Sequence, residues 1–148
     1  MAKQADEDSM CMDIAYRAAQ RSHDPKFGVG CVIVTPDHMM TLGWNGMPSG
    51  MDNEMREPIL IRDPCGCLHL KNKTRPEVMH AEFNALSKFS GSTASAEGST
   101  LYTTLSQCLP CAIFTHRSKV RRVVYDEVYK DGAGIEFLLE RGIEVVRI

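Results

Sequence analysis

Residues 100–148 read TLYTTLSQCLPCAIFTHRSKVRRVVYDEVYKDGAGIEFLLERGIEVVRI, in which strand-like and helix-like segments alternate. The strand-like runs lie at 100–105, 121–126 and 143–148. The helix-like runs lie at 107–118 and 133–141, and Gly142 supplies a stop signal for the second. Such alternation is typical of parallel strands joined by helical crossovers, so this half predicts an α/β architecture.

The first half adds a helix and a hairpin. Apolar residues recur at helical spacing over 8–22, and strand-like runs at 29–35 and 39–45 flank a Pro-Asp turn pair. A further helix is expected over 80–90, after a long loop at about 46–79 whose length is typical of functional or disordered connections. The whole pattern predicts one domain over residues 1–148, a three-layer α/β/α sandwich around a five-stranded mixed sheet.

Composition narrows the class of protein. The chain has 148 residues, of which 43% are hydrophobic and 24% charged, and its net charge is −2. These values are ordinary for a soluble globular protein. A near-neutral chain is not attracted to long nucleic acid or to a membrane surface, so we expect neither partner. The polar N-terminus lacks an export signal and no apolar run could span a bilayer, which favours a cytoplasmic protein.

The most informative motif joins two short segments, which read His80-Ala81-Glu82 and Cys108-Leu109-Pro110-Cys111. One imidazole and two thiolates occupy three corners of a zinc tetrahedron and leave the fourth for water. Glu82 lies two positions after the histidine, where a carboxylate can move protons without binding the metal. Both segments begin expected helices, whose N-termini favour thiolate over thiol, and Pro110 falls in a first turn that tolerates it.

The alternative is a closed structural zinc site. Such a site normally has four protein ligands, and no fourth ligand lies beside either segment of the motif. A structural site also has no use for Glu82. The sequence therefore favours a catalytic zinc bound by His80, Cys108 and Cys111.

The other cysteines have two interpretations. Without an export signal, cysteines are expected to serve metals or the core rather than disulfides. Cys11 and Cys31 lie in an expected helix and strand, where a small apolar packing role accounts for them. Cys65, Cys67 and His69 lie within five residues in the long loop and are candidates for a second, structural zinc, although no fourth ligand is identified.

With these residues in hand, the chain resembles the deoxycytidylate (dCMP) deaminases of the cytidine deaminase superfamily. The zinc motif alone identifies only the superfamily. The segments Ala19–Pro25 (AQRSHDP) and Gly43–Gly50 (GWNGMPSG) point to the branch that acts on nucleoside monophosphates. Members of the family usually carry proline directly before the first cysteine, where this chain has Gln107. All the expected ligands remain.

The resemblance implies a cytidine deaminase-like fold and hydrolysis of dCMP to dUMP and ammonia, which supplies dUMP for thymidylate synthesis. Glu82 is then the proton shuttle, and the Ala81 N–H binds the carbonyl of the base. Asn45 binds the sugar hydroxyl, unless it is only a turn residue of the Asn-Gly pair. Candidates for the phosphate are Ser22, Lys26 and Tyr129, each of which has the alternative of a solvated surface residue.

The resemblance also implies regulation and assembly. The segment that begins Gly43, Trp44, Asn45 and Gly46 looks like the element that binds dCTP or dTTP between subunits in related enzymes, with Mg²⁺ accompanying the nucleotide. Related enzymes are commonly hexamers, so a homo-oligomer is expected.

Two rival functions stay open at the level of the sequence. The first is a zinc deaminase that acts on a modified dCMP or on another cytosine or adenine base. The second is a zinc-stabilised regulatory module that keeps the fold without turnover. The presence of Glu82 argues against the second rival.

Overall fold

The computed structural model describes residues 2–148. Its helices are α1 (Ala2–Ala19), α2 (Ala81–Ser87), the short 3₁₀ helix η1 (Lys88–Gly91), α3 (Leu109–Arg117) and α4 (Ala133–Glu140). Its strands are β1 (Gly30–Val34), β2 (Met40–Trp44), β3 (Arg56–Arg62), β4 (Leu68–Thr74), β5 (Thr100–Leu105), β6 (Arg122–Glu127) and β7 (Glu144–Arg147). Within these residues, no helix combines the length and apolarity that crossing a bilayer requires.

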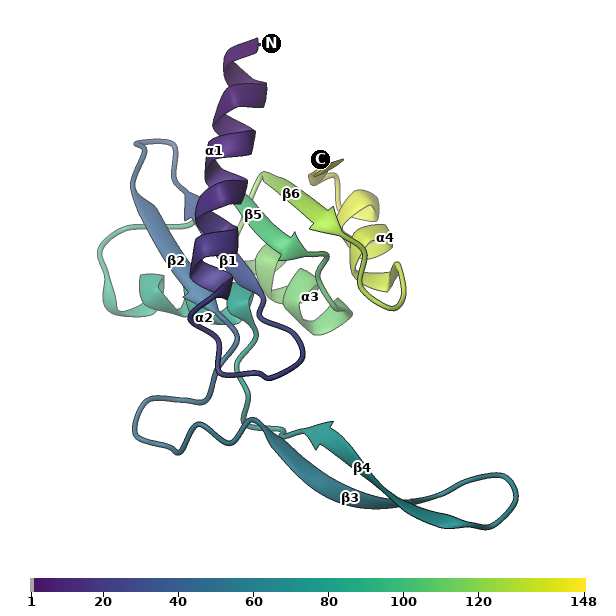
Figure 1. The fold of residues 1–148 in the computed structure, drawn as a ribbon. Coiled ribbons are helices and arrows are strands. Elements are labelled where there is room, and N and C mark those ends of the chain that lie inside the picture. Colours follow the sequence, from purple (N-terminus) through teal and green to yellow (C-terminus); the bar gives the residue numbers. More distant parts are fainter. Residues whose placement is uncertain (1) are drawn as a thin grey trace.

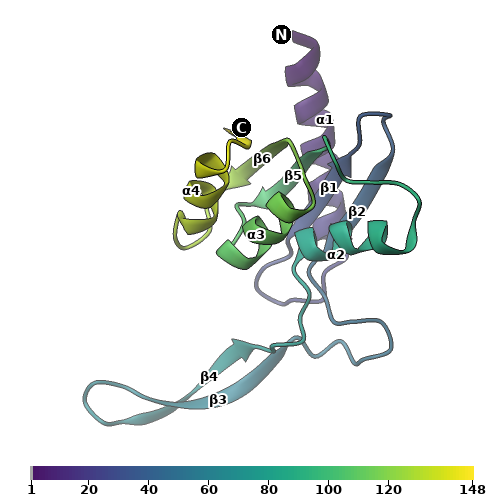
Figure 2. The same ribbon diagram turned by 180° about the vertical axis from the view of Figure 1, so that it is seen from behind.

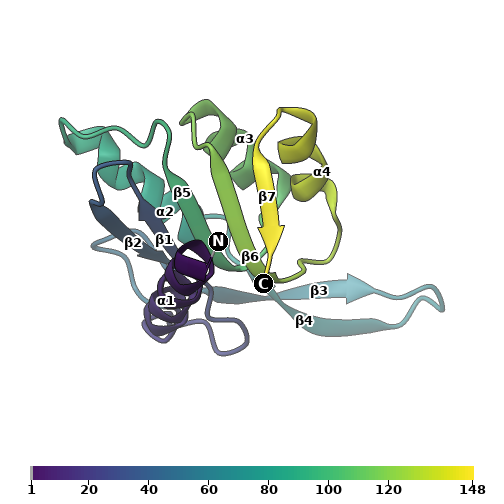
Figure 3. The same ribbon diagram turned by 90° about the horizontal axis from the view of Figure 1, so that it is seen from above.

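A five-stranded mixed sheet lies at the centre, in the order β2-β1-β5-β6-β7. Strand β1 is antiparallel to both β2 and β5, whereas β5, β6 and β7 are parallel. Seen from above, α1 covers one face of the sheet, and α2, α3 and α4 cover the other (Figure 3). The predicted three-layer α/β/α sandwich with five strands is confirmed.

Successive residues of the strands point to opposite faces, so the sheet has a core on each side. One core packs α1 against β1, β5 and β6 through Cys11, Met12, Ala15, Val32, Val34, Tyr102 and Val124. The other packs the remaining helices against the same strands through Cys31, Ile33, Ala81, Ala85, Leu86, Leu101, Ala112, Val123 and Leu138. Cys11 and Cys31 are fully buried, as expected for small apolar residues.

Two glycines bring helix backbones directly onto the β1–β2 hairpin. A Cβ on Gly30 would lie 1.8 Å from the carbonyl oxygen of Ala15 in α1. A Cβ on Gly43 would lie 2.2 Å from the carbonyl oxygen of Ala81 in α2. Neither position has room for any side chain, so Gly43 fixes the height at which α2 begins on the sheet.

The stretch at 46–79, which we expected to be a long loop, contains a second sheet. Strands β3 and β4 pair antiparallel with Leu60 opposite Leu70, and this ribbon (residues 56–74) projects from the body of the molecule (Figures 1 and 2). Strand β4 is exposed almost throughout, and its apolar alternation is limited to Leu68 and Leu70, which is a weak signal for a half-buried strand. Pro58 also made β3 hard to predict as a strand, because proline within a strand is tolerated only at an edge, as in this ribbon.

A buried ion pair ties α1 to the sheet. The carboxylate of Asp8 accepts hydrogen bonds from both terminal nitrogens of Arg122 in β6, at 2.7 and 2.8 Å. The Tyr102 hydroxyl donates a third, at 3.0 Å. The side chains of Asp8 and Arg122 are each 8% exposed, so bulk water does not replace these contacts if one partner is lost.

We expect Asp8→Asn to lower the free energy of unfolding by about 3 kcal/mol, the lower end of the range for breaking a buried pair, because Arg122 keeps a contact with Glu144. The hydrogen bonds from Arg122 hold the pKa of Asp8 below its usual 3.8. The stability that the pair contributes is therefore full above pH 3.8 and is lost as the pH falls through the lower, folded value. Urea denaturation at neutral and acidic pH measures both effects.

The control is Asp6→Asn, an exposed carboxylate of the same helix, which should change stability by less than about 0.5 kcal/mol. An acid-induced loss of stability that is equally steep in Asp8→Asn and in the unsubstituted protein would contradict the assignment.

Candidate active site

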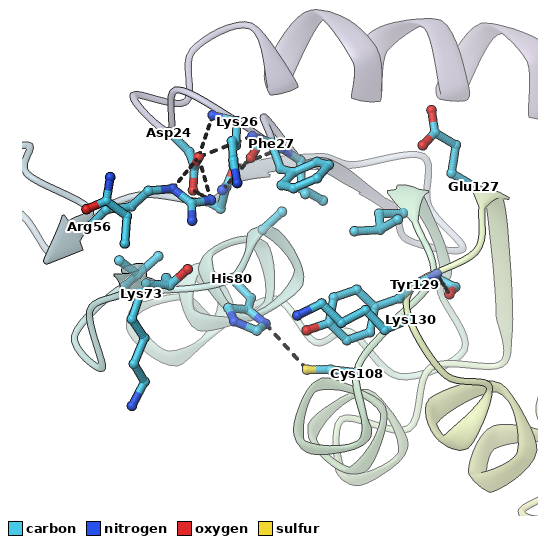
Figure 4. A pocket seen from close by; sticks show the side chains of 18 of the residues that line it. Asp24, Lys26, Phe27, Arg56, Lys73, His80, Cys108, Glu127, Tyr129 and Lys130 are labelled. Carbon is cyan, nitrogen blue, oxygen red and sulfur yellow. Dashed lines mark hydrogen bonds and ion pairs between the residues drawn. The ribbon is translucent and has the colours of Figure 1, made fainter. Parts of the chain in front are cut away.

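The expected zinc ligands come together at the starts of two helices. His80 is the N-cap residue of α2, and Cys108 is the N-cap residue of α3. The His80 Nδ1 atom lies 3.4 Å from the sulfur of Cys108 and 3.4 Å from that of Cys111. Figure 4 shows the His80 ring turned towards Cys108 across the gap between the two helices.

This donor set fits zinc. All three donor atoms lie within 4.8 Å of one another, and no fourth histidine, cysteine or carboxylate of residues 2–148 joins the group. One nitrogen and two sulfurs are the ligands that a borderline-soft cation prefers, and three protein ligands leave a coordination position for water. A hydrogen bond from the Cys111 thiol, assisted by His80, lowers the pKa of Cys108 to about 4, which favours the thiolate form that binds metal.

The Glu82 carboxyl group is enclosed next to these donors. It belongs to the first turn of α2, and the residue is only 4% exposed. Removal from water raises the pKa of Glu82 to about 7. Its nearest hydrogen-bond donor in β5 is the Thr103 hydroxyl, at 3.5 Å. An enclosed carboxyl group with such a pKa can both accept and return a proton near neutral pH.

A cavity of about 900 Å³ opens onto the donor cluster. Of the residues predicted for the substrate, Asn45, Ala81, Lys26 and Tyr129 line it, whereas Ser22 does not. Ala81 is the first residue of α2, where the backbone N–H has no partner inside the helix. Apart from Ser22, the expected binding groups for base, sugar and phosphate thus share one cavity with His80, Cys108 and Glu82.

Ser22 instead shapes the segment before β1. Its hydroxyl oxygen accepts a hydrogen bond from the Asp24 backbone N–H at 3.2 Å. Ser22 is not among the residues that line the cavity, and within residues 2–148 this turn contains the hydrogen bond of its side chain.

Asn45 has two hydrogen bonds to the backbone. Its side-chain oxygen accepts from the Val29 N–H, and its side-chain nitrogen donates to the Phe27 carbonyl, both at 2.8 Å. The residue is 8% exposed. Asn45 therefore does more than occupy a turn, because it holds the segment before β1 against the end of β2. Its contact with a sugar hydroxyl stays a prediction.

The neighbouring residues of the Gly43–Gly50 segment also have packing roles. Trp44 lies between two cations, with the Arg21 guanidinium 5.1 Å and the Lys88 ammonium 5.5 Å from its ring centre. The backbones of Gly46 and Met79 exchange hydrogen bonds of 3.0 and 2.9 Å. These two hydrogen bonds join the ends of the stretch that carries the ribbon. We call this pair, Gly46 and Met79, the neck of the ribbon.

The sequence did not reveal a second group of cavity residues. Arg56 of β3 forms a forked contact with the Asp24 carboxylate, with nitrogen-oxygen distances of 2.9 to 3.1 Å. Phe27, Lys73 and Lys130 also line the cavity (Figure 4). Asp24 and Arg56 are 32 residues apart in the sequence, so only the folded structure shows that they form a pair. The charge alternation within β4 was the available signal for Lys73.

Gln107, which stands where proline is usual in the family, is a packing residue. It is 2% exposed, and its amide nitrogen donates to the Thr115 hydroxyl at 2.9 Å. A Cβ on Gly134 of α4 would lie 2.0 Å from the Gln107 carbonyl oxygen. Gln107, the residue that replaces the usual proline, thus packs where the start of α3 meets α4. Pro110 lies in the first turn of α3, as predicted.

Residues 5–127 match the family model described as the cytidine and deoxycytidylate deaminase zinc-binding region. The chain belongs to this family. The match spans every residue of the donor cluster, Glu82 and the ribbon, so the family assignment and the geometry concern the same part of the chain.

Relatives and solved structures agree with this family. The chain is 28% identical to the deoxycytidylate deaminase of Enterobacteria phage T2, over 95% of this chain and 91% of the phage protein. It is 31% identical to that of Mus musculus over 77% of this chain, and it spans only 61% of the mouse protein. The crystal structure of dCMP deaminase from cyanophage S-TIM5 in complex with dCMP and dUMP has a TM-score of 0.82 at 31% identity, with 97% of each chain covered.

We expect Asn45→Ala to lower the free energy of unfolding by about 2–4 kcal/mol, because it leaves the Val29 N–H and the Phe27 carbonyl without their partner. Asn45→Asp should also destabilise the protein, because its carboxylate still accepts from the Val29 N–H but sets a second acceptor oxygen against the Phe27 carbonyl. Chemical denaturation of the zinc-loaded protein measures both. The exposed Asn53→Ala is the control, and a cost for Asn45→Ala as small as its own would refute the bridging role.

Proposed function

We propose that this protein is a zinc-dependent dCMP deaminase, which converts dCMP and water into dUMP and ammonia. The dUMP supplies thymidylate synthesis. The observation that carries the proposal is the group of His80, Cys108 and Cys111 beside the enclosed carboxyl group of Glu82. The S-TIM5 enzyme, whose solved complex contains dCMP and dUMP, supports the choice of substrate because the two chains align over almost their whole length.

In this proposal His80, Cys108 and Cys111 hold one catalytic zinc. When bound, zinc lowers the pKa of its water from 15.7 towards about 7 and so makes hydroxide available at neutral pH. Glu82 accepts a proton from the attacking water and delivers it to N3 of the cytosine ring. It then takes the remaining proton from the new hydroxyl group on C4 and passes it to the amine, which leaves as ammonia when the C4–N bond breaks. The enclosed position of Glu82 keeps bulk water from competing for that proton.

The cavity supplies groups for each part of the nucleotide. The Ala81 N–H, which is free of the helix, binds the carbonyl of the base, and Asn45 presents its remaining amide hydrogen to the sugar. Lys26 and Tyr129 are the phosphate ligands, because they line the cavity and Ser22 does not. Ser22 supports the segment that carries Lys26.

The proposal also covers the regulation of the enzyme, its assembly and the cellular compartment in which it works. The Gly43–Gly50 segment binds dCTP or dTTP with Mg²⁺, and the chain assembles as a homo-oligomer, a hexamer in the family pattern. The whole chain acts as one domain. It works in the cytoplasm, where reducing conditions keep the ligand thiols free. The second zinc expected at Cys65, Cys67 and His69 is separate from the reaction, because none of these residues lines the cavity.

We expect Glu82→Gln to lower kcat by about 10²–10⁴-fold, the usual contribution of a general acid-base group, while the zinc content is unchanged. Ammonia release from dCMP and metal analysis of the same preparation measure the two quantities. Glu140→Gln, an exposed carboxylate at the end of α4, is the control and should keep full activity. Near-normal turnover by Glu82→Gln would end the assignment of the proton shuttle.

A substrate panel separates this function from its rivals. We expect dCMP to be deaminated with a far higher kcat/KM than CMP or deoxycytidine, since the sugar contact and the phosphate ligands each distinguish one of these. The rate on 5-methyl-dCMP, the fourth member of the panel, measures the room around C5 of the base. Repeating the panel with dCTP and Mg²⁺ tests regulation. A better rate on another member of the panel would move the assignment to that substrate, and no turnover on any member would favour a regulatory module.

A further inference from the structure

A second cluster of metal-binding side chains lies at the tip of the ribbon. Here Asp63, Cys65 and Cys67 place their ligand atoms within 4.8 Å of one another. The sulfur of Cys65 lies 2.9 Å from a carboxylate oxygen of Asp63 and 2.8 Å from the sulfur of Cys67. This cluster shares no residue with the cavity lining or with the catalytic donors, and it lies at the turn of the ribbon, which projects from the body of the molecule (Figure 1).

The backbone of the tip is folded so as to gather these side chains. The Asp63 N–H donates to the Cys67 carbonyl at 3.0 Å, and the Cys67 N–H donates to the Asp63 carboxylate at 2.9 Å. Gly66 adopts a φ of +89°, which only glycine adopts without strain, and so lets the chain reverse between the two cysteines. The turn thereby holds three potential ligands on one side.

His69 supplies a fourth donor. Its Nδ1 atom lies 4.0 Å from the second carboxylate oxygen of Asp63. His69 is the second residue of β4 and follows Cys67 by two positions, and it lies opposite Ile61 of β3 at the turn end of the ribbon. The sequence interpretation included Cys65, Cys67 and His69 but lacked a fourth ligand, and the structure points to Asp63 for that place.

Packing does not explain these thiols. Free cysteine is among the most buried residue types, and Cys11 and Cys31 follow that rule with full burial. Cys65 and Cys67 are both exposed, and they contact each other and Asp63 rather than an apolar core. Two exposed thiols, a carboxylate and an imidazole in one turn are a donor set that suits zinc.

We propose that Asp63, Cys65, Cys67 and His69 bind a second zinc ion in a closed, four-ligand site. Zinc-sulfur bonds of about 2.3 Å in a tetrahedron set the two sulfurs about 3.8 Å apart, which exposed side chains reach by rotation about χ1. With four protein ligands there is no position for a reactive water, so this zinc is structural. The proposal does not depend on the proposed deaminase activity.

The tip zinc has a consequence for the cavity. An isolated two-stranded hairpin is only marginally stable in water, and no other strand of residues 2–148 pairs with this ribbon. The ribbon nevertheless supplies cavity residues, among them Arg56, Ile59, Ile61 and Lys73. Because binding free energy at a metal site becomes folding free energy, a zinc ion that clamps the tip keeps this wall of the cavity formed.

Metal analysis of the full chain, purified with a reducing agent and saturated with zinc, tests the proposal. We expect two zinc ions per chain in the unsubstituted protein and one in Cys65→Ser/Cys67→Ser. The variant Cys108→Ser/Cys111→Ser, which lacks the catalytic donors, should also keep one zinc ion. Loss of both ions in this last variant, or an unchanged zinc content in Cys65→Ser/Cys67→Ser, overturns the proposal.

Cobalt substitution identifies the ligands. We expect the Cys108→Ser/Cys111→Ser protein to show a thiolate-to-cobalt charge-transfer band, and this band should vanish when Cys65 and Cys67 are also replaced. A disulfide between Cys65 and Cys67 that persists under reduction, seen as two missing thiols in a thiol titration, would overturn the proposal in favour of a redox pair.

An isosteric pair of variants tests the fourth ligand. Asp63→Asn keeps an oxygen that accepts from the Cys67 N–H, and it removes only the charge that binds metal. We expect it to weaken zinc at the tip by at least about tenfold, since even the loss of an outer-shell partner costs that much. Glu57→Gln, an exposed ribbon carboxylate outside the cluster, should leave the affinity unchanged. Equal affinities in the two variants would remove Asp63 from the site.

Hydrogen exchange of the ribbon distinguishes this proposal from the proposed function. In Cys65→Ser/Cys67→Ser we expect faster exchange of the amides that pair β3 with β4, and a higher KM for dCMP with kcat retained. The ribbon amides report on the tip zinc even if the protein proves inactive on dCMP. Unchanged exchange in that variant would show that zinc does not support the ribbon.

Discussion

The arrangement of this protein depends on the contact between helix backbones and the sheet. At Gly43 the first turn of α2 lies directly on β2, and at Gly134 the α4 backbone lies directly on the peptide that precedes Cys108. Contacts without an intervening side chain leave little freedom in height or angle. The N-cap residues of α2 and α3 are therefore held to one separation, and both carry zinc donors. Packing and metal chemistry thus require the same geometry.

Much of this arrangement could be predicted from the sequence, because it rests on local patterns. The strand-helix alternation after residue 100 predicted the parallel strands and their crossovers, and the two motif halves predicted their own positions at helix starts. The fully buried strand β1 has a continuous run of small and apolar residues, and β5 is rich in β-branched and aromatic residues, so both are readily predicted as strands. The donor cluster and Glu82 could be predicted because each half of the motif is contiguous.

The remainder depended on contacts that leave no local pattern. The ribbon has no apolar face turned to the core, and the alternation in β4 has only Leu68 and Leu70 as apolar members, so it is a weak basis for predicting a strand. The pairing of Asp24 with Arg56, and that of Asp8 with Arg122, joins residues far apart in sequence whose charges are common on any surface. Ser22, a candidate phosphate ligand in the sequence, is not among the residues that line the cavity, and no local pattern distinguishes a serine that binds a ligand from one that shapes a turn.

The position of Trp44 between two cations also gives the molecule a built-in optical probe. It is the sole tryptophan in the sequence, so the intrinsic fluorescence of the chain reports on one place. Its indole touches Arg21 at the end of α1 and Lys88 after α2, and its carbonyl oxygen accepts from the Asn84 side chain. Any event that shifts the neck of the ribbon relative to either helix must alter the charges around that ring and hence its emission.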